Sequence, residues 1–179
     1  DWLVTFAETG EHAMTGARIK RASPHLRGNN FLLTYGDGLS DVDIGELTRF
    51  HKRQGKLATV TAVRTPGRFG ELRLEGDTVR AFEEKPEVTQ GRINGGFFML
   101  QSEVIDRLDD TTDLIWERGP LEGLAADGQL AAYRHDGFWY AMDTPRDHAE
   151  LEKLWATGRA PWATWQGPNK VNKTAQRGH

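Results

Sequence analysis

The chain has 179 residues with 26 acidic and 23 basic side chains, which gives a formal net charge of −3 at pH 7. This length is enough for one domain with a hydrophobic core, and the near balance of charge excludes nucleic-acid binding driven by bulk positive charge while allowing a local anion site. The absence of cysteine excludes disulfides and thiolate zinc sites, and no apolar run approaches the roughly 20 residues of a membrane span. We therefore expect a cytoplasmic protein with neither a membrane nor a nucleic-acid partner.

The first part of the chain predicts alternating strands and helices. Strands are expected at 2–6, 31–35 and 57–63, and helices at 15–23 and 43–54. The run from Phe31 to Tyr35 is continuously apolar, a pattern typical of a strand that is buried on both faces. Asp43 is placed to cap the second helix, and Gly55 to end it. A strand, helix and strand in this order favour a parallel sheet.

The rest of the chain continues the alternation around one hairpin. The turn Glu75-Gly-Asp77 predicts a hairpin between the runs 72–74 and 79–82. Further strands are expected at 96–100, 130–134 and 138–142, and helices at 103–108, 114–127 and 145–155. The predicted fold is α/β, with a mixed, mostly parallel sheet and helices on both faces. Residues 1–165 are expected to form one domain and the polar tail 166–179 to be disordered.

Two aspartates at the ends of predicted strands are candidate metal ligands. Asp37 lies between two glycines directly after the apolar run 31–35, and Asp143 follows the aromatic run 138–142. Carboxylates at the ends of two buried strands can present a divalent cation to a phosphate group. The alternative is structural, because Asp37 also suits a turn and Asp143 also suits the cap of the helix that follows it.

Three other polar side chains are candidates for anion contacts, each with a structural alternative. Lys85 follows two glutamates and is held extended by Pro86, but a lysine in this setting is also typical of a solvated surface. Asn94 begins a glycine-rich turn. Arg18 lies beside a glycine-containing run, which suits phosphate binding as well as an exposed helix face.

The order of several motifs resembles that of the sugar-1-phosphate nucleotidylyltransferase family, in particular its glucose-1-phosphate cytidylyltransferase branch. The resemblance extends from about Glu8 to Trp165. The motifs that carry it are Met14-Thr-Gly-Ala-Arg18, Thr34-Tyr-Gly-Asp-Gly38, Pro66-Gly-Arg-Phe-Gly70, Glu83-Glu-Lys-Pro86, Ile93-Asn-Gly-Gly-Phe-Phe98, Trp116-Glu117, Gly137-Phe-Trp139 and Met142-Asp-Thr144. Glu-Glu-Lys-Pro is typical of the wider family, whereas the first three motifs are more specific to the cytidylyl branch.

The resemblance implies an enzyme that joins CTP and glucose 1-phosphate to give CDP-glucose and pyrophosphate with Mg²⁺, in the biosynthesis of nucleotide sugars such as those of O-antigen lipopolysaccharide. It implies a homo-oligomer for the complete protein. The roles that it implies for single residues are metal binding for Asp37 and Asp143, catalysis for Asp37, Lys85 and Arg18, and substrate binding for Arg18, Gly36, Gly70, Glu84, Lys85 and Asn94.

One motif of the family is missing from the chain. Members open with a glycine-rich loop, Gly-Gly-x-Gly-Thr-Arg, that holds the base and the triphosphate, and these 179 residues contain none. We therefore expect the chain to be the C-terminal part of such an enzyme and to be inactive in isolation. Three other functions stay open: a thymidylyl- or uridylyltransferase, a glycosyltransferase of similar fold, and a non-catalytic subunit that binds sugar nucleotides.

Overall fold

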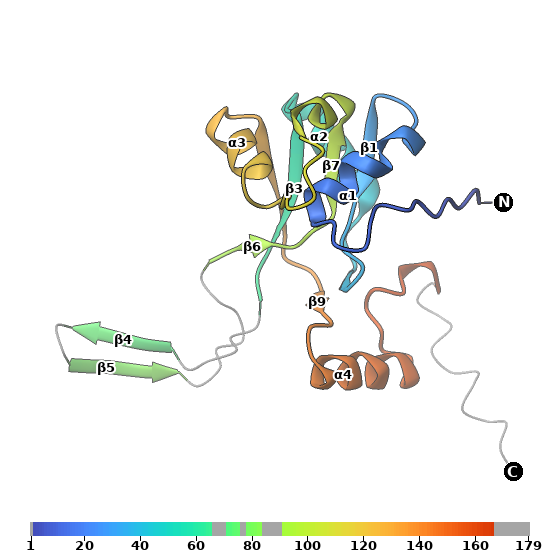
Figure 1. Ribbon diagram of the computed structural model, residues 1–179. Coiled ribbons are helices and arrows are strands. Elements are labelled where there is room, and N and C mark those ends of the chain that lie inside the picture. Colours follow the sequence, from blue (N-terminus) through green and yellow to red (C-terminus); the bar gives the residue numbers. More distant parts are fainter. Residues whose placement is uncertain (1, 66–70, 76–77, 84–90, 167–179) are drawn as a thin grey trace, which may run out of the picture. The chain divides into compact units, whose positions relative to one another are not determined.

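The computed structural model describes residues 2–65, 71–75, 78–83 and 91–166, and the chain forms two compact units (Figure 1). The first unit contains residues 1–34, 44–61 and 96–133, and the second contains 35–43, 62–95 and 134–179. No helix within the described ranges has the length and hydropathy of a membrane-spanning segment.

In the sheet of the first unit, two strands run parallel to each other, and a third strand lies between them in the opposite direction. Its strands are β1 (Asn30–Leu33), β7 (Phe98–Gln101), β3 (Ala58–Val63) and β8 (Leu130–His135). β7 lies between β1 and β3 and is antiparallel to both, while β8 pairs with β3. The predicted α/β class with a mixed sheet is confirmed. The expectation of mostly parallel neighbours is wrong for the ladders on either side of β7, because β7 lies between the parallel strands β1 and β3 and runs in the opposite direction to both.

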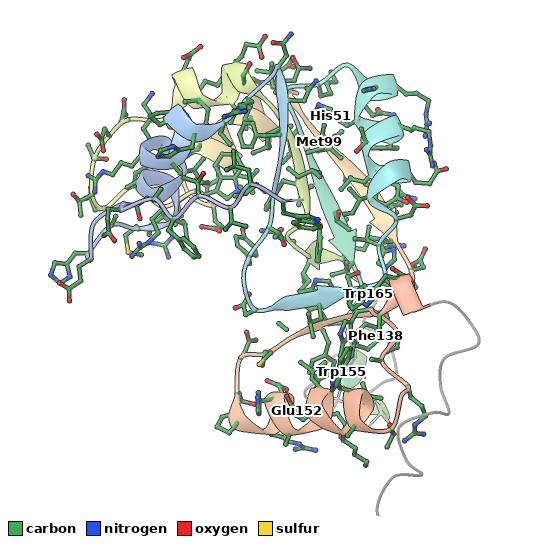
Figure 2. All side chains as sticks on the ribbon, turned by 90° about the vertical axis from the view of Figure 1, so that its right-hand side faces the viewer. His51, Met99, Phe138, Glu152, Trp155 and Trp165 are labelled. Atoms are coloured by element: carbon green, nitrogen blue, oxygen red, sulfur yellow. The ribbon has the colours of Figure 1, made fainter. Side chains whose placement is uncertain are left out.

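Helices cover both faces of this sheet, as predicted. They are α1 (Thr15–Ala22), α2 (Ile44–Gln54) and α3 (Pro120–Ala126), with 3₁₀ turns at Ser23–His25 and Ser102–Arg107. Figure 2 shows α1 and α2 on opposite sides of the strands. Paired Thr59 and Met99 share the face of α2, where His51 Nδ1 lies 2.8 Å from Thr59 Oγ1. On the other face, the buried Phe98 ring meets Trp116 edge-on with centroids 5.7 Å apart.

Three sequence-based expectations are wrong in this unit. Residues 2–6 form no strand, and Trp2 and Phe6 are almost fully exposed. β1 is not buried on both faces, since Leu32 is half exposed. The helix expected from residue 114 begins only at Pro120, because Gly119 has a φ of +70° that interrupts any helix there.

The second unit is built from short strands and one long helix. β2 (Gly38–Ser40) pairs antiparallel with β9 (Trp139–Ala141), β6 (Ile93–Asn94) pairs with the end of β3, and α4 (Pro145–Ala156) follows β9. A hairpin of β4 (Glu71–Glu75) and β5 (Thr78–Glu83) agrees with the predicted one. Phe138, labelled in Figure 2, contacts the rings of Tyr140 and Trp162. A 3₁₀ turn at Thr164–Gln166 ends the described part, so the tail 167–179 and its expected disorder lie outside it.

Replacing Gly16 by alanine should destabilise the first unit. A Cβ at this position would lie 2.7 Å from Leu114 Cγ and 2.9 Å from Leu114 O, so α1 could not keep its approach to residue 114. We expect a loss of about 1–3 kcal/mol in the free energy of unfolding, the usual cost of overpacking. Gly123→Ala in α3 is the matched control, because a Cβ there would meet no atom within 4 Å. Urea unfolding should show a lower midpoint only for Gly16→Ala, and equal midpoints would contradict the close approach.

The stability of the protein should fall as the pH decreases through the range where free histidine titrates. His51 is fully buried in α2, and this burial lowers its pKa from the ordinary 6.5. The unfolded chain therefore binds a proton at about pH 6.5 that the folded protein does not, so stability is complete above this pH and decreases below it until the folded pKa is reached. His51→Asn removes the titration, and unfolding free energies measured between pH 5 and 8 should depend less on pH in the variant. Identical pH dependence in both proteins would contradict this account.

Candidate active site

The two candidate metal ligands lie at one end of the same two-stranded ladder. In the antiparallel pairing of β2 with β9, Gly38 lies opposite Ala141. One residue beyond this pair, the Met142 N–H donates to the Asp37 carbonyl at 2.9 Å. Asp37 therefore immediately precedes β2, and Asp143 follows β9 by two residues. The sequence placed Asp37 after the strand 31–35, but that strand ends at Leu33, and Asp37 belongs to the turn that begins β2. The two aspartates are brought together by this ladder.

The helix cap next to Asp143 is made by another residue. Thr144 is the N-cap of α4, and its Oγ1 accepts a hydrogen bond from Asp147 N at 3.2 Å. Asp147 Oδ2 accepts in return from Thr144 N at 3.0 Å, which completes a capping box. Tyr140 OH donates to Asp147 Oδ1 at 3.1 Å. The structural alternative for Asp143, a helix cap, is therefore wrong, and the box fixes the backbone directly after it.

Asn94 belongs to the same unit as the two aspartates. It lies on β6, where its Nδ2 donates to Tyr35 OH at 3.1 Å. The next residue is also held, because Trp139 Nε1 donates to Gly95 O at 2.8 Å. Asn94 is exposed, so these contacts leave it accessible to a ligand.

Arg92 anchors the start of the segment 92–97, which contains β6 and the positive-φ residues Gly96 and Phe97 and is called the Asn94 turn below. Arg92 Nη1 donates to Ala62 O and His135 O, each at 3.1 Å, and its Nη2 lies 2.6 Å from Asp136 Oδ1. The hydrogen bond from Arg92 holds the pKa of the Asp136 carboxyl below its usual value. Arg64 adds a longer ion pair to Asp136 at 3.7 Å. Asp136 therefore serves the structure of the turn.

The donor set fits a divalent metal that is shared with a substrate. Asp37 and Asp143 are exposed carboxylates, and Mg²⁺ is usually held by one or two carboxylates together with waters and substrate phosphates. Within the described ranges, no group of three or more histidine, aspartate or glutamate side chains could hold a metal ion. Gly36 is exposed next to Asp37, and a Cβ added there would meet no atom within 4 Å, so the backbone at this turn is open to a ligand.

The structure places Arg18 in the first unit. Its Nη1 donates to Thr9 Oγ1 at 2.9 Å and its Nη2 to Glu11 O at 3.1 Å, so it orders the segment before α1. The predicted contact of Arg18 with the nucleotide stays a prediction. Gly70, Glu84 and Lys85 lie outside the described residues, and their predicted roles also stay predictions.

The sequence analysis missed residues that support the site. Thr144 could have been found, since Thr-x-x-Asp at the start of a helix resembles a capping-box signature. Tyr35 and Trp139 could not, because their partners Asn94 and Gly95 are distant in sequence and no local pattern indicates such hydrogen bonds.

A family model and curated relatives all match this chain to nucleotidyl transferases. Residues 5–141 match the family model described as nucleotidyl transferase. The chain is 49% identical over 166 residues to a glucose-1-phosphate cytidylyltransferase of Salmonella typhi, and this match covers 92% of the chain and 64% of that relative. It is 42% identical over 164 residues to a probable glucose-1-phosphate cytidylyltransferase of Bacillus subtilis, with the same coverage of 92% and 64%. The chain therefore spans 64% of the length of these relatives.

A solved structure supports the fold. The crystal structure of HddC from Yersinia pseudotuberculosis superposes with a TM-score of 0.59 at 20% sequence identity, over 79% of this chain and 62% of that one. At this identity, the likeness concerns the fold alone.

Proposed function

The chain belongs to the nucleotidyl transferase family, and on this premise we propose that its protein is a glucose-1-phosphate cytidylyltransferase. The proposed reaction joins CTP and glucose 1-phosphate to give CDP-glucose and pyrophosphate. The observation that supports the proposal is the end of the β2–β9 ladder, where Asp37 precedes one strand and Asp143 follows the other, in the unit that also contains Asn94. The relatives named above, which have this activity in their names, support the choice of substrates.

The chemistry needs no general base from the protein. A phosphate oxygen of glucose 1-phosphate attacks the α-phosphorus of CTP, and the bond from that phosphorus to the oxygen of the leaving pyrophosphate breaks with its electron pair. The second pKa of a phosphate monoester is about 6, so the attacking oxygen is already ionised near neutral pH. The main barrier is the approach of two anions, which a protein lowers by positioning them and by supplying positive charge.

The residues of the chain divide these tasks. Asp37 and Asp143 would hold Mg²⁺, which when bound neutralises phosphate charge and orients the phosphates. Lys85 would pair with the sugar phosphate, and Glu84 and Asn94 would hydrogen-bond glucose hydroxyls or phosphate oxygens. Arg18 would contact the nucleotide, and the open backbone at Gly36, together with Gly70, would allow close approach of a ligand.

A substrate panel tests the proposed function. Pyrophosphate release should be measured with Mg²⁺ for CTP, UTP, dTTP and GTP, each with glucose 1-phosphate and with mannose 1-phosphate, in the protein as its gene encodes it. We expect the pair of CTP and glucose 1-phosphate to give the highest kcat/KM. Preference for UTP or dTTP would indicate the related uridylyl or thymidylyl activity. No pyrophosphate release from any pair would favour a non-catalytic binding role.

Removing one carboxylate charge from the ladder end should impair metal binding and turnover. Asp37→Asn and Asp143→Asn each replace a charged ligand of a hard cation by a neutral one, and we expect turnover to fall at least about tenfold, equivalent to about 1.4 kcal/mol of transition-state stabilisation. Isothermal calorimetry with Mn²⁺ should show weaker binding in both variants. Asp109→Asn, an exposed aspartate of the first unit, is the control. Turnover and Mn²⁺ affinity equal to the control would exclude these aspartates as ligands.

Replacing Lys85 by alanine should lower turnover more than stability. A charge-assisted hydrogen bond to phosphate is worth about 1.5–3 kcal/mol, so kcat/KM should fall at least about tenfold. Removing an exposed lysine usually changes the free energy of unfolding by no more than about 0.5 kcal/mol. Lys52→Ala, an exposed lysine of α2, controls for loss of a surface charge. Wild-type kinetics together with a wild-type melting temperature would show that Lys85 is an ordinary surface residue.

The proposal extends to assembly and location. The protein would act in the cytoplasm, where CTP and sugar phosphates are available, and would form a homo-oligomer. Light scattering coupled to gel filtration measures the mass of the assembly, and the mass of a single chain would contradict the homo-oligomer.

A further inference from the structure

Two hydrogen bonds hold Asn94 and Gly95 at the end of β6, one with Tyr35 in the segment before β2 and one with Trp139 on β9. Tyr35 OH accepts from Asn94 Nδ2 at 3.1 Å, and Trp139 Nε1 donates to Gly95 O at 2.8 Å. The first bond orients the side chain of Asn94, and the second fixes the peptide carbonyl next to it. Gly95 is buried, so a missing partner for its carbonyl would be costly.

The same two segments carry the candidate metal ligands. Tyr35 lies two residues before Asp37, and Trp139 lies four residues before Asp143. The segments pair with each other, since Trp139 on β9 lies opposite Ser40 on β2. Residues 94 and 95 are therefore hydrogen-bonded to both segments, with Tyr35 before the Asp37 end of the ladder and Trp139 at its Ser40 end. All of these residues belong to one unit.

Stability of the turn alone does not account for this arrangement. Arg92 already connects the turn to Ala62 O, His135 O and Asp136 through hydrogen bonds of 2.6 to 3.1 Å. The contacts of Arg92 do not involve the Asn94 amide, whereas the hydroxyl of Tyr35 accepts a hydrogen bond from it. A side chain that binds an anionic substrate contributes most when its orientation is set before the substrate arrives.

We infer that Tyr35 and Trp139 are positioning residues for the sugar phosphate. Tyr35, next to the Asp37 turn, and Trp139, at the Ser40 end of the β2–β9 ladder, hold Asn94 and Gly95 against the two segments that carry the candidate metal ligands. Asn94 would thereby keep its orientation when glucose 1-phosphate binds. This inference rests on the proposed function, since it assigns the anchoring of the same site. Neither residue touches the reacting atoms, and both act through Asn94.

Conservative variants separate this role from packing. Tyr35→Phe removes only the hydroxyl, and Trp139→Phe removes the indole N–H while keeping an aromatic ring. Calorimetry in Mg²⁺ should show about three- to tenfold weaker binding of glucose 1-phosphate to each variant, the effect of losing one hydrogen bond. The affinity for Mn²⁺ without sugar phosphate should stay within about twofold of wild type, because the carboxylates are untouched.

A double-mutant cycle with Asn94→Ala gives the most informative comparison. If Tyr35 acts through Asn94, then Tyr35→Phe should have no further effect on sugar-phosphate affinity in the Asn94→Ala background. Tyr133→Phe is the control, because Tyr133 belongs to the first unit, where its ring packs edge-on against Phe50, and the affinity of this variant for glucose 1-phosphate should equal that of wild type.

Other results of these experiments would overturn either the positioning role or the proposed function. Wild-type affinity in Tyr35→Phe and Trp139→Phe, or losses that add fully to that of Asn94→Ala, would overturn the positioning role. Parallel losses of sugar-phosphate and Mn²⁺ affinity would indicate general disruption of the unit and would also overturn it. A wild-type protein that binds no sugar 1-phosphate would contradict the proposed function itself, and this inference would fall with it.

Discussion

The site depends on one short antiparallel ladder. β2 and β9 pair over only three residues each, and the pairing is extended by the hydrogen bond from Met142 N to the Asp37 carbonyl at 2.9 Å. This backbone bond determines that two carboxylates far apart in sequence leave the ladder at the same end. Without this bond, the backbone of the turn at Gly36 would not be fixed relative to the segment before α4. The position of the proposed metal ligands is thus specified by main-chain register, and their side chains would supply the chemistry.

Other carboxylates of this unit show why Asp37 and Asp143 are the better candidates for metal ligands. Asp147 is used by the capping box and by Tyr140, Asp136 pairs with Arg92, and Asp41 lies 2.9 Å from His135 Nε2. Moving any of these three to a metal would break a structural hydrogen bond. Asp37 is exposed in its turn, and the cap at Thr144 spares Asp143 from the role of helix cap. The three carboxylates with these structural contacts are therefore weaker candidates for a metal than Asp37 and Asp143, which flank the end of the ladder.

Features encoded over a few residues could be predicted, and those that depend on distant pairing could not. The helix 43–54, the hairpin around 75–77 and the helix from Pro145 follow from apolar period, turn residues and proline, and the structure has all three. The insertion of β7 between β1 and β3 depends on pairing between distant strands, which no local pattern reveals. Residues 2–6 have the composition of a strand but lie unpaired in the described structure. For the site, the sequence proposes Asp37, Asp143 and Asn94, whose roles stay predictions, whereas the hydrogen bonds of Tyr35 and Trp139 to residues 94 and 95 emerge only in three dimensions.

The most direct test of the account is anomalous diffraction from crystals of the protein grown with Mn²⁺ and glucose 1-phosphate. The account predicts one strong peak at the end of the β2–β9 ladder, with a carboxylate oxygen of both Asp37 and Asp143 at roughly 2.1–2.2 Å, near the distance typical of such hard cations. It also predicts the sugar phosphate within hydrogen-bonding distance of Asn94. A metal ion bound by Asp41 or Asp43 instead, or one that contacts neither Asp37 nor Asp143, would contradict the central claim.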